Sequence, residues 1–143
     1  MPYERPLIGE ILTKRKSITA EQLDHALAAQ KKDGGFVGEI LVKLGYVEER
    51  DIVVALVVQC GLPYIAINKY TIDPTVVGLI PKQAAQEGRL IAMDRVGDIL
   101  SVVMTNPLSD EQKAKLEAMT KCRVATFIAT KSEIEEAIAR NYN

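Results

Sequence analysis

One sequence motif is written twice in the N-terminal half of the chain. Residues 8–30 and 37–59 align at a spacing of 29 residues. The two copies are identical at Gly9/Gly38, Glu10/Glu39, Ile11/Ile40, Leu12/Leu41, Lys14/Lys43, Ala26/Ala55, Leu27/Leu56 and Gln30/Gln59. Self-similarity at a fixed period indicates that both copies form the same structural unit. The repeat therefore sets the architecture that we expect for the first half.

Each copy has the pattern of a short helix, a turn and a longer helix. Apolar residues recur at helical spacing in the first segment of each copy, from Ile8 and from Val37. Thr19 and Gln22 form a predicted capping box at the start of the longer helix of the first copy. Neither copy alone can bury its apolar face. We therefore expect residues 1–62 to form one four-helix unit from the tandem helix pairs.

Residues 63–143 follow a different pattern, in which β-type and helical segments alternate. The expected strands cover residues 62–67, 89–94, 99–105 and 123–129, and the expected helices cover 74–80, 109–120 and 130–142. A turn over residues 95–98 joins two of the strands into a hairpin. We predict an α+β chain, in which the four-helix unit is followed by a small α/β sandwich with a short, mainly antiparallel sheet.

Composition and charge exclude several classes of partner. The chain is 48% hydrophobic, which is enough for a core, and its net charge is −1. Basic and acidic residues nearly balance in both halves, so we expect no binding of nucleic acid or of an anionic membrane. Cys60 and Cys122 are expected to be buried free thiols, as is typical of a reducing cytosol. No secretory signal or membrane-spanning run is present, and we expect a soluble cytoplasmic protein.

The sequence contains no recognisable catalytic constellation. The phosphate-binding GxxxxGK[ST] pattern and the dinucleotide-binding GxGxxG pattern are both absent. His25 is the only histidine, which excludes metal sites built on paired histidines, and we expect it on the surface. Adjacent carboxylates at 48–49, 110–111 and 135–136 fall at helix starts or on polar helix faces. We expect neither an enzyme nor a bound metal or cofactor.

The repeat and the segments after it resemble a known domain family. Each copy has an apolar residue before glycine and a leucine three residues after that glycine. Each copy also has an Ala-Leu pair with glutamine three residues after its leucine. Downstream come the segments GLPYIAI, IDPTVVGLIPKQAA, ILSVVMTNP and AIARNY, in that order. These features are similar to the MshEN-type N-terminal domain of type II secretion and type IV pilus assembly ATPases, which is also called GspE/PilB-like. The resemblance covers nearly all of the chain, and the repeat is its most specific part.

The resemblance implies a role in assembly and not in catalysis. Domains of this type precede an ATP-hydrolysing motor and bind partners at the inner-membrane platform. These 143 residues contain no motor sequence, so we expect no ATP hydrolysis by them. The implied function is a non-catalytic interaction and regulatory domain that links a motor ATPase to its platform protein. Such a domain is cytoplasmic and reaches the inner membrane only through a protein partner.

The resemblance also implies an alternative function as a second-messenger sensor. In a subset of the family, the two copies together bind cyclic di-GMP, a two-fold ring with two guanines and two phosphates. Backbone N–H groups near the glycines, the glutamine amides and apolar residues under the bases would form the site. The candidate residues are Arg5, Leu7, Ile8, Gly9, Leu12, Gln30, Phe36, Val37, Gly38, Leu41 and Gln59. The same glycines and glutamines could instead serve helix packing and helix ends.

Two positions depart from the pattern of the ligand-binding members. There the residue two before the glycine is arginine, which can bind guanine through two hydrogen bonds, whereas this chain has Leu7 and Phe36. Each lost bidentate contact removes ~1–3 kcal/mol, so two losses weaken binding by about a hundredfold or more. Arg5 could partly substitute, and Phe36 could stack on a base. Lys16 stands where the second copy has Gly45, so we expect an altered turn in the first copy.

Overall fold

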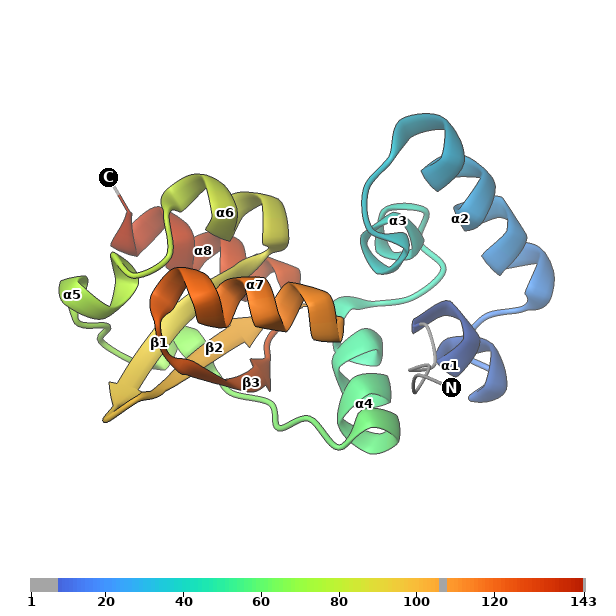
Figure 1. Ribbon diagram of the computed structural model, residues 1–143. Coiled ribbons are helices and arrows are strands. Elements are labelled where there is room, and N and C mark those ends of the chain that lie inside the picture. The colour runs from blue at the N-terminus through green and yellow to red at the C-terminus, as the bar shows by residue number, and fades with distance from the viewer. Residues whose placement is uncertain (1–7, 106–107, 143) are drawn as a thin grey trace. The chain divides into compact units, whose positions relative to one another are not determined.

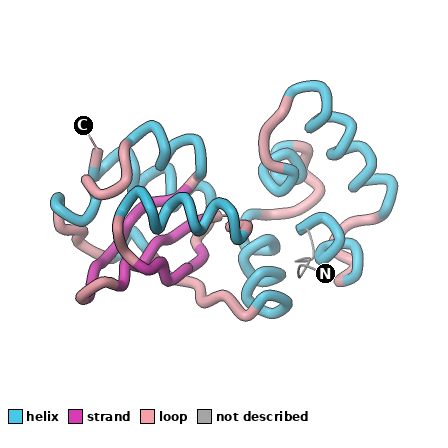
Figure 2. Tube along the Cα trace, in the orientation of Figure 1, coloured by secondary structure: helices cyan, strands magenta, loops and turns pink. Residues whose placement is uncertain are grey.

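The computed structural model describes residues 8–105 and 108–142, with only the backbone of Gln59 (Figure 1). The chain divides into two compact units, Met1–Gly61 and Leu62–Asn143, which we call the repeat unit and the sheet unit. The boundary lies one residue before the position expected from the sequence, because Gly61 ends the last helix of the repeat unit in a left-handed conformation. In the described residues, all strands lie in the sheet unit (Figure 2). The predicted α+β class is confirmed.

Four helices form the described part of the repeat unit. They are α1 (Ile8–Lys14), α2 (Ala20–Asp33), α3 (Val37–Lys43) and α4 (Glu49–Cys60). Each copy is thus a short helix followed by a longer one, as predicted. The fully buried side chains of this core are Leu12, Ala26, Leu41, Ala55 and Leu56. All of them belong to the positions at which the two copies are identical, so the shared positions mainly form the core.

The two copies pack against each other in a reciprocal way. The contacts of α1 are mainly with α4, and those of α3 are mainly with α2, so each short helix packs on the long helix of the other copy. Smaller contacts join the helices within each copy and join α1 to α3. Exchanging the two copies leaves this set of contacts unchanged. The apolar stripe of each helix is therefore buried only when both copies are present.

The turn that follows the short helix has the same backbone structure in both copies. Equivalent hydrogen bonds close the two turns: Ser17 N donates to Leu12 O at 2.9 Å, and Tyr46 N donates to Leu41 O at 3.0 Å. The residue before each donor has a positive φ, which is 60° at Lys16 and 80° at Gly45. The expectation of an altered turn in the first copy is therefore wrong. Lys16 adopts the left-handed conformation instead, at a cost of roughly 1–2 kcal/mol.

The sheet unit is built on three strands in the order β1-β2-β3: β1 (Leu90–Val96), β2 (Ile99–Met104) and β3 (Arg123–Ile128). β1 and β2 form the predicted antiparallel hairpin, with Gly97 at a φ of 62° in its turn. β2 and β3 are parallel, because the helix α7 (Asp110–Thr120) connects them as a crossover. The sheet is therefore mixed, with one antiparallel and one parallel pair.

Several helices of the sheet unit pack against its strands. α5 (Pro74–Val77), α6 (Lys82–Gly88) and α8 (Lys131–Asn141) contact β1, and α7 contacts β3. The helix expected over residues 74–80 is shorter, and α6, which the sequence analysis did not predict, begins directly after Pro81. Proline suits this place because the first amides of a helix lack internal partners.

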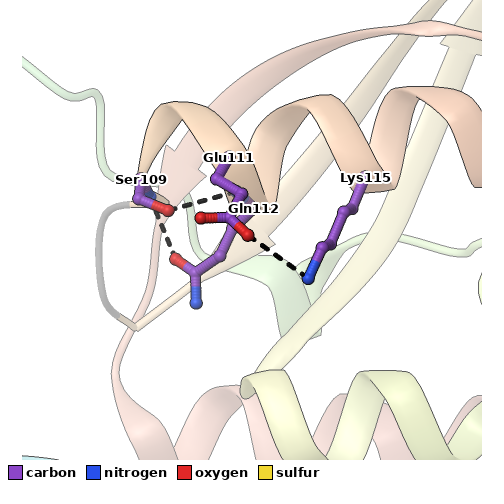
Figure 3. A network of polar contacts seen from close by, with 4 residues as sticks. All are labelled: Ser109, Glu111, Gln112 and Lys115. Atoms are coloured by element: carbon purple, nitrogen blue, oxygen red, sulfur yellow. Dashed lines mark hydrogen bonds and ion pairs between the residues drawn. The ribbon is translucent and has the colours of Figure 1, made fainter.

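The predicted capping box at Thr19 is formed, and equivalent capping boxes begin α7 at Ser109 and α8 at Thr130. At the start of α7, Ser109 Oγ accepts from Gln112 N at 3.1 Å, and Gln112 Oε1 accepts from Ser109 N at 3.0 Å (Figure 3). An exposed ion pair of 3.5 Å between Glu111 and Lys115 follows one turn later (Figure 3). Local sequence thus fixes where these helices begin.

Residues near both ends of the sheet unit form hydrogen bonds with other parts of that unit. Near its start, the segment expected as a strand makes one parallel bridge from Tyr64 to Ile128, beside a 3-10 helix at Ile67–Lys69. Near its end, the Tyr142 hydroxyl donates to Ile80 O at 2.7 Å and lies 3.1 Å from Val77 O. Burial there raises the pKa of Tyr142 to about 12.

The left-handed conformation of Lys16 predicts that glycine stabilises the protein at residue 16 but destabilises it at residue 14. Lys16→Gly should raise the free energy of unfolding by up to about 1 kcal/mol, because it removes the strain at this φ. Gly45→Ala should lower that free energy by about 1 kcal/mol. Lys14→Gly, inside α1, is the matched control and should be destabilising. Urea unfolding followed by circular dichroism measures all three, and a Lys16→Gly variant as unstable as Lys14→Gly would contradict the assigned turn.

Candidate ligand site in the tandem repeat

Most of the described candidate ligand residues lie in or just before the short helices α1 and α3. These two helices contact each other, and Gly9 and Gly38 are both buried. Ile8 lies beside Gly38, because its Cγ2 would be 3.9 Å from a Cβ added there. The structure therefore brings corresponding parts of the two copies together. Arg5 and Leu7 lie outside the described residues, and so does the side chain of Gln59.

The two motif glycines have a packing role. A Cβ added at Gly9 would lie 2.5 Å from Leu23 Cδ1, and one added at Gly38 would lie 3.3 Å from Ile52 Cδ1. Leu23 and Ile52 are equivalent positions of the repeat. In each copy, the absence of a side chain lets the second helix approach the first. The repeat pattern does not show these two contacts directly, although the equal spacing of Leu23 and Ile52 from the glycines is a signal of them.

Several apolar candidate residues are part of the protein core. Leu12 and Leu41 are fully buried, and Ile8 is buried as well. These side chains already contact protein atoms, so a base could reach them only if neighbouring side chains moved. Val37 and Phe36 are half-buried. Phe36 is the extended N-cap residue of α3 and is thus close to the site expected for a ligand.

The glutamine of the first copy holds the connection between the copies. Gln30 Nε2 donates to Gly35 O at 2.9 Å, in the loop that leads into α3. This hydrogen bond uses one of the two N–H groups of the amide and leaves the other for a further partner. Gln30 is half-buried. It serves a structural purpose that does not depend on a ligand.

The charges of α1 and α3 follow the helix dipole. Glu10 and Glu39 lie in the first turns, and Lys14 and Lys43 lie in the last turns. The first turns, where the glycines lie, thus carry acidic and not basic side chains. A ligand with phosphate groups would need cations from other segments to offset this charge.

Histidine, cysteine and acidic side chains are the remaining candidate groups in the described part of the chain. No group of three or more His, Cys, Asp or Glu residues gathers there in a way that could hold a metal ion. His25 is exposed, as expected, and its Nδ1 lies 2.5 Å from Tyr46 Oη. Both cysteines are free; Cys122 is buried as predicted, whereas Cys60 is half-buried. No helix of residues 8–105 or 108–142 has the length and apolar character to cross a bilayer.

Comparison with curated proteins finds relatives among pilus motors. The chain is 32% identical over 135 residues to the type IV pilus assembly ATPase PilB of Myxococcus xanthus. It is 30% identical over 137 residues to the PilB protein of Thermus thermophilus. Both alignments cover 94% of this chain, but they cover only 24% and 15% of the relatives. The chain therefore spans at most about a quarter of the length of these proteins.

Comparison with solved structures finds the same fold over nearly the whole chain. A structure of MshE with cyclic di-GMP (cdg) is 27% identical, with a TM-score of 0.74, and the match covers 96% of this chain and 100% of that one. The N-terminal domain of XpsE matches with a TM-score of 0.81 over 99% of this chain and 100% of its own. Its identity is 20%, so this second likeness concerns the fold alone.

The family match falls on a different part of the chain from the repeat. The model of the MshEN domain family matches residues 60–143, which are the sheet unit and the residues just before it. The downstream segments from GLPYIAI to AIARNY, on which the resemblance also rests, lie within this matched range. Since this match covers more than half of the chain, the protein belongs to the MshEN domain family.

Proposed function

We propose that this chain is a non-catalytic interaction and regulatory domain of a type IV pilus or type II secretion ATPase. The observation that carries the proposal is the extent of its likeness to PilB, which covers 94% of this chain and at most 24% of the relative. A motor would occupy sequence outside the matched region. The domain would act by positioning the motor. When the domain binds a platform protein in the cytoplasm, the attached motor would be held in a defined orientation.

The outer face of α4 is the contact surface that we favour in the repeat unit. Val54 and Val58 lie one helical turn apart and are 45% and 60% exposed. The corresponding residues of the first copy are His25 and Ala29, so the fold does not require large apolar side chains here. Exposed apolar residues that the fold does not need are typical of a surface that binds another protein.

A second candidate function is binding of cyclic di-GMP in the repeat unit. It is favoured by the likeness to MshE, whose structure contains this ligand. The paired glycines and the contact between α1 and α3 supply a two-fold frame that suits a two-fold ligand. Phe36 stands where the ligand-binding pattern has arginine, and the glycines already serve helix packing. We therefore propose a weakened site and rank this function second.

The proposed contact surface predicts a loss of partner binding without a loss of stability. The double variant Val54→Ser/Val58→Ser should reduce capture of the platform protein or motor of the same pilus or secretion system by about tenfold or more. Its free energy of unfolding should change by less than about 1 kcal/mol, because both side chains are exposed. Ala28→Ser/Lys32→Ser, on the exposed face of α2, is the matched control.

Pull-down with the purified platform protein and motor measures this effect. Undiminished binding by the α4 variant would exclude α4 as the contact. Failure of the unaltered chain to bind either protein would contradict the interaction function itself.

The weakened ligand site predicts that restoring two arginines increases affinity for cyclic di-GMP. The variant Leu7→Arg/Phe36→Arg should bind about a hundredfold more tightly than the natural sequence, because each arginine can form a bidentate contact with guanine. Leu7→Gln/Phe36→Gln adds polarity without charge and should not reproduce the gain. Isothermal titration calorimetry gives the affinities. Sub-micromolar binding by the natural chain would show an intact site, and no binding by the arginine variant would exclude the frame as a ligand site.

A further inference from the structure

The sheet unit has a cavity that belongs to neither proposed function. It has a volume of about 280 Å³ and is lined by Tyr70, Thr71, Asp73, Met93 and Asp94. The first three residues precede or cap α5, and the last two belong to β1. All five lie in the sheet unit, and none of them is a candidate ligand residue of the repeat unit.

A β-bulge lies in the part of β1 that lines the cavity. Ala92 pairs with Val102 and Asp94 pairs with Ser101, so Met93 is the extra residue of the strand. Consecutive side chains of a regular strand point to opposite faces of the sheet. At the bulge this alternation is interrupted, and both Met93 and Asp94 line the cavity.

Two carboxylates, those of Asp73 and Asp94, give the cavity negative charge. Asp73 Oδ1 accepts from the Thr75 amide and from the Thr75 hydroxyl, both at 2.8 Å. These two bonds lower the pKa of Asp73. Asp94 Oδ1 accepts from Arg95 N at 2.9 Å, whereas Arg95 Nε donates to Gly97 O. No ion pair joins either carboxylate to a basic side chain among the described residues.

Polarisable apolar groups lie beside these carboxylates. Tyr70 is 49% exposed, so part of its ring is open to solvent, and Met93 is half-buried. An aromatic ring attracts a cation placed over its face. The combination of a ring, a thioether and two carboxylates is complementary to a flat cationic group. Guanidinium has this shape, because it is planar, always charged and able to stack and form hydrogen bonds at once.

We propose that this cavity binds an arginine side chain of a protein partner. Its volume lies just below the range of about 300–1,000 Å³ that is usual for small-molecule sites, so one long side chain fits it better than a nucleotide. The guanidinium stacks on Tyr70 and meets the carboxylates of Asp73 and Asp94. Lysine has a compact ammonium group and cannot stack in this way.

The test uses the whole chain labelled with ¹⁵N and the peptide acetyl-Gly-Arg-Gly-amide. Amide resonances of Tyr70, Thr71 and Asp94 should shift in a saturable way, with a dissociation constant on the order of millimolar for one isolated side chain. The corresponding glutamine and lysine peptides should shift these resonances several-fold less at equal concentration. The same spectra report whether each variant remains folded.

Two variants locate the binding and a third controls for general charge. Asp94→Asn and Tyr70→Leu should each weaken arginine-peptide binding by about threefold, because each removes one exposed charge or cation–π contact. Asp110→Asn removes an exposed carboxylate of α7 and should leave binding unchanged. Asp73 is kept, since it caps α5.

Three results would overturn the proposal. The first is an absence of saturable shifts at the cavity residues. The second is equal binding of the arginine and lysine peptides, which would mean that the cavity responds to charge and not to the guanidinium plane. The third is equal weakening by Asp94→Asn and Asp110→Asn, which would place the effect on the overall charge of the protein. None of these results bears on cyclic di-GMP or on the α4 surface.

Discussion

The reciprocal packing of two sequence copies is the interaction on which the repeat unit depends. α1 is covered mainly by α4 and α3 mainly by α2, so neither copy has a complete core of its own. Gly9 and Gly38 add a close approach of the two helices within each copy, because Leu23 and Ile52 occupy the space beside them. The identical positions of the repeat are therefore explained first by packing, and any ligand must bind to a frame that packing already determines.

The two copies share the same helix–turn–helix backbone but differ in their exposed side chains. Leu56 is fully buried, whereas Leu27 at the corresponding position is 43% exposed. Lys16 replaces glycine in a left-handed turn without changing its hydrogen bonds. α4 carries Val54 and Val58 where α2 carries smaller or polar residues. This divergence is what we expect when one copy is adapted to a partner while both retain the shared core.

Features set by local sequence were predicted more successfully than features set by distant partners. The helix pairs, the hairpin and the capping boxes depend on neighbouring residues, and the structure has them. The parallel pairing of β3 depends on how α7 returns to the sheet, and it was not foreseen. α6 is not apparent from the sequence, because Pro81 can end the helix expected over residues 74–80 as readily as it can precede a new one.

The candidate site could be predicted only as a set of positions. The sequence pattern correctly indicated that Gly9 and Gly38 are equivalent, but it did not reveal that Leu23 and Ile52 lie against them, because these contacts depend on how the helices pack. The bulge that exposes Met93 and Asp94 to one cavity is likewise a property of the paired sheet and not of β1 alone. The helix contacts and the bulge both depend on tertiary packing, which the sequence pattern does not show.

Circular dichroism of the separated copies tests whether each copy needs the other in order to fold. Peptides of residues 1–35 and 36–61 should each lack cooperative thermal unfolding, because each short helix would lose the long helix that covers it. A mixture of the two peptides, and the continuous segment 1–61, should gain helix and unfold cooperatively. Cooperative unfolding of either peptide alone, with no change on mixing, would show that a single copy folds without its partner and that reciprocal packing is not required.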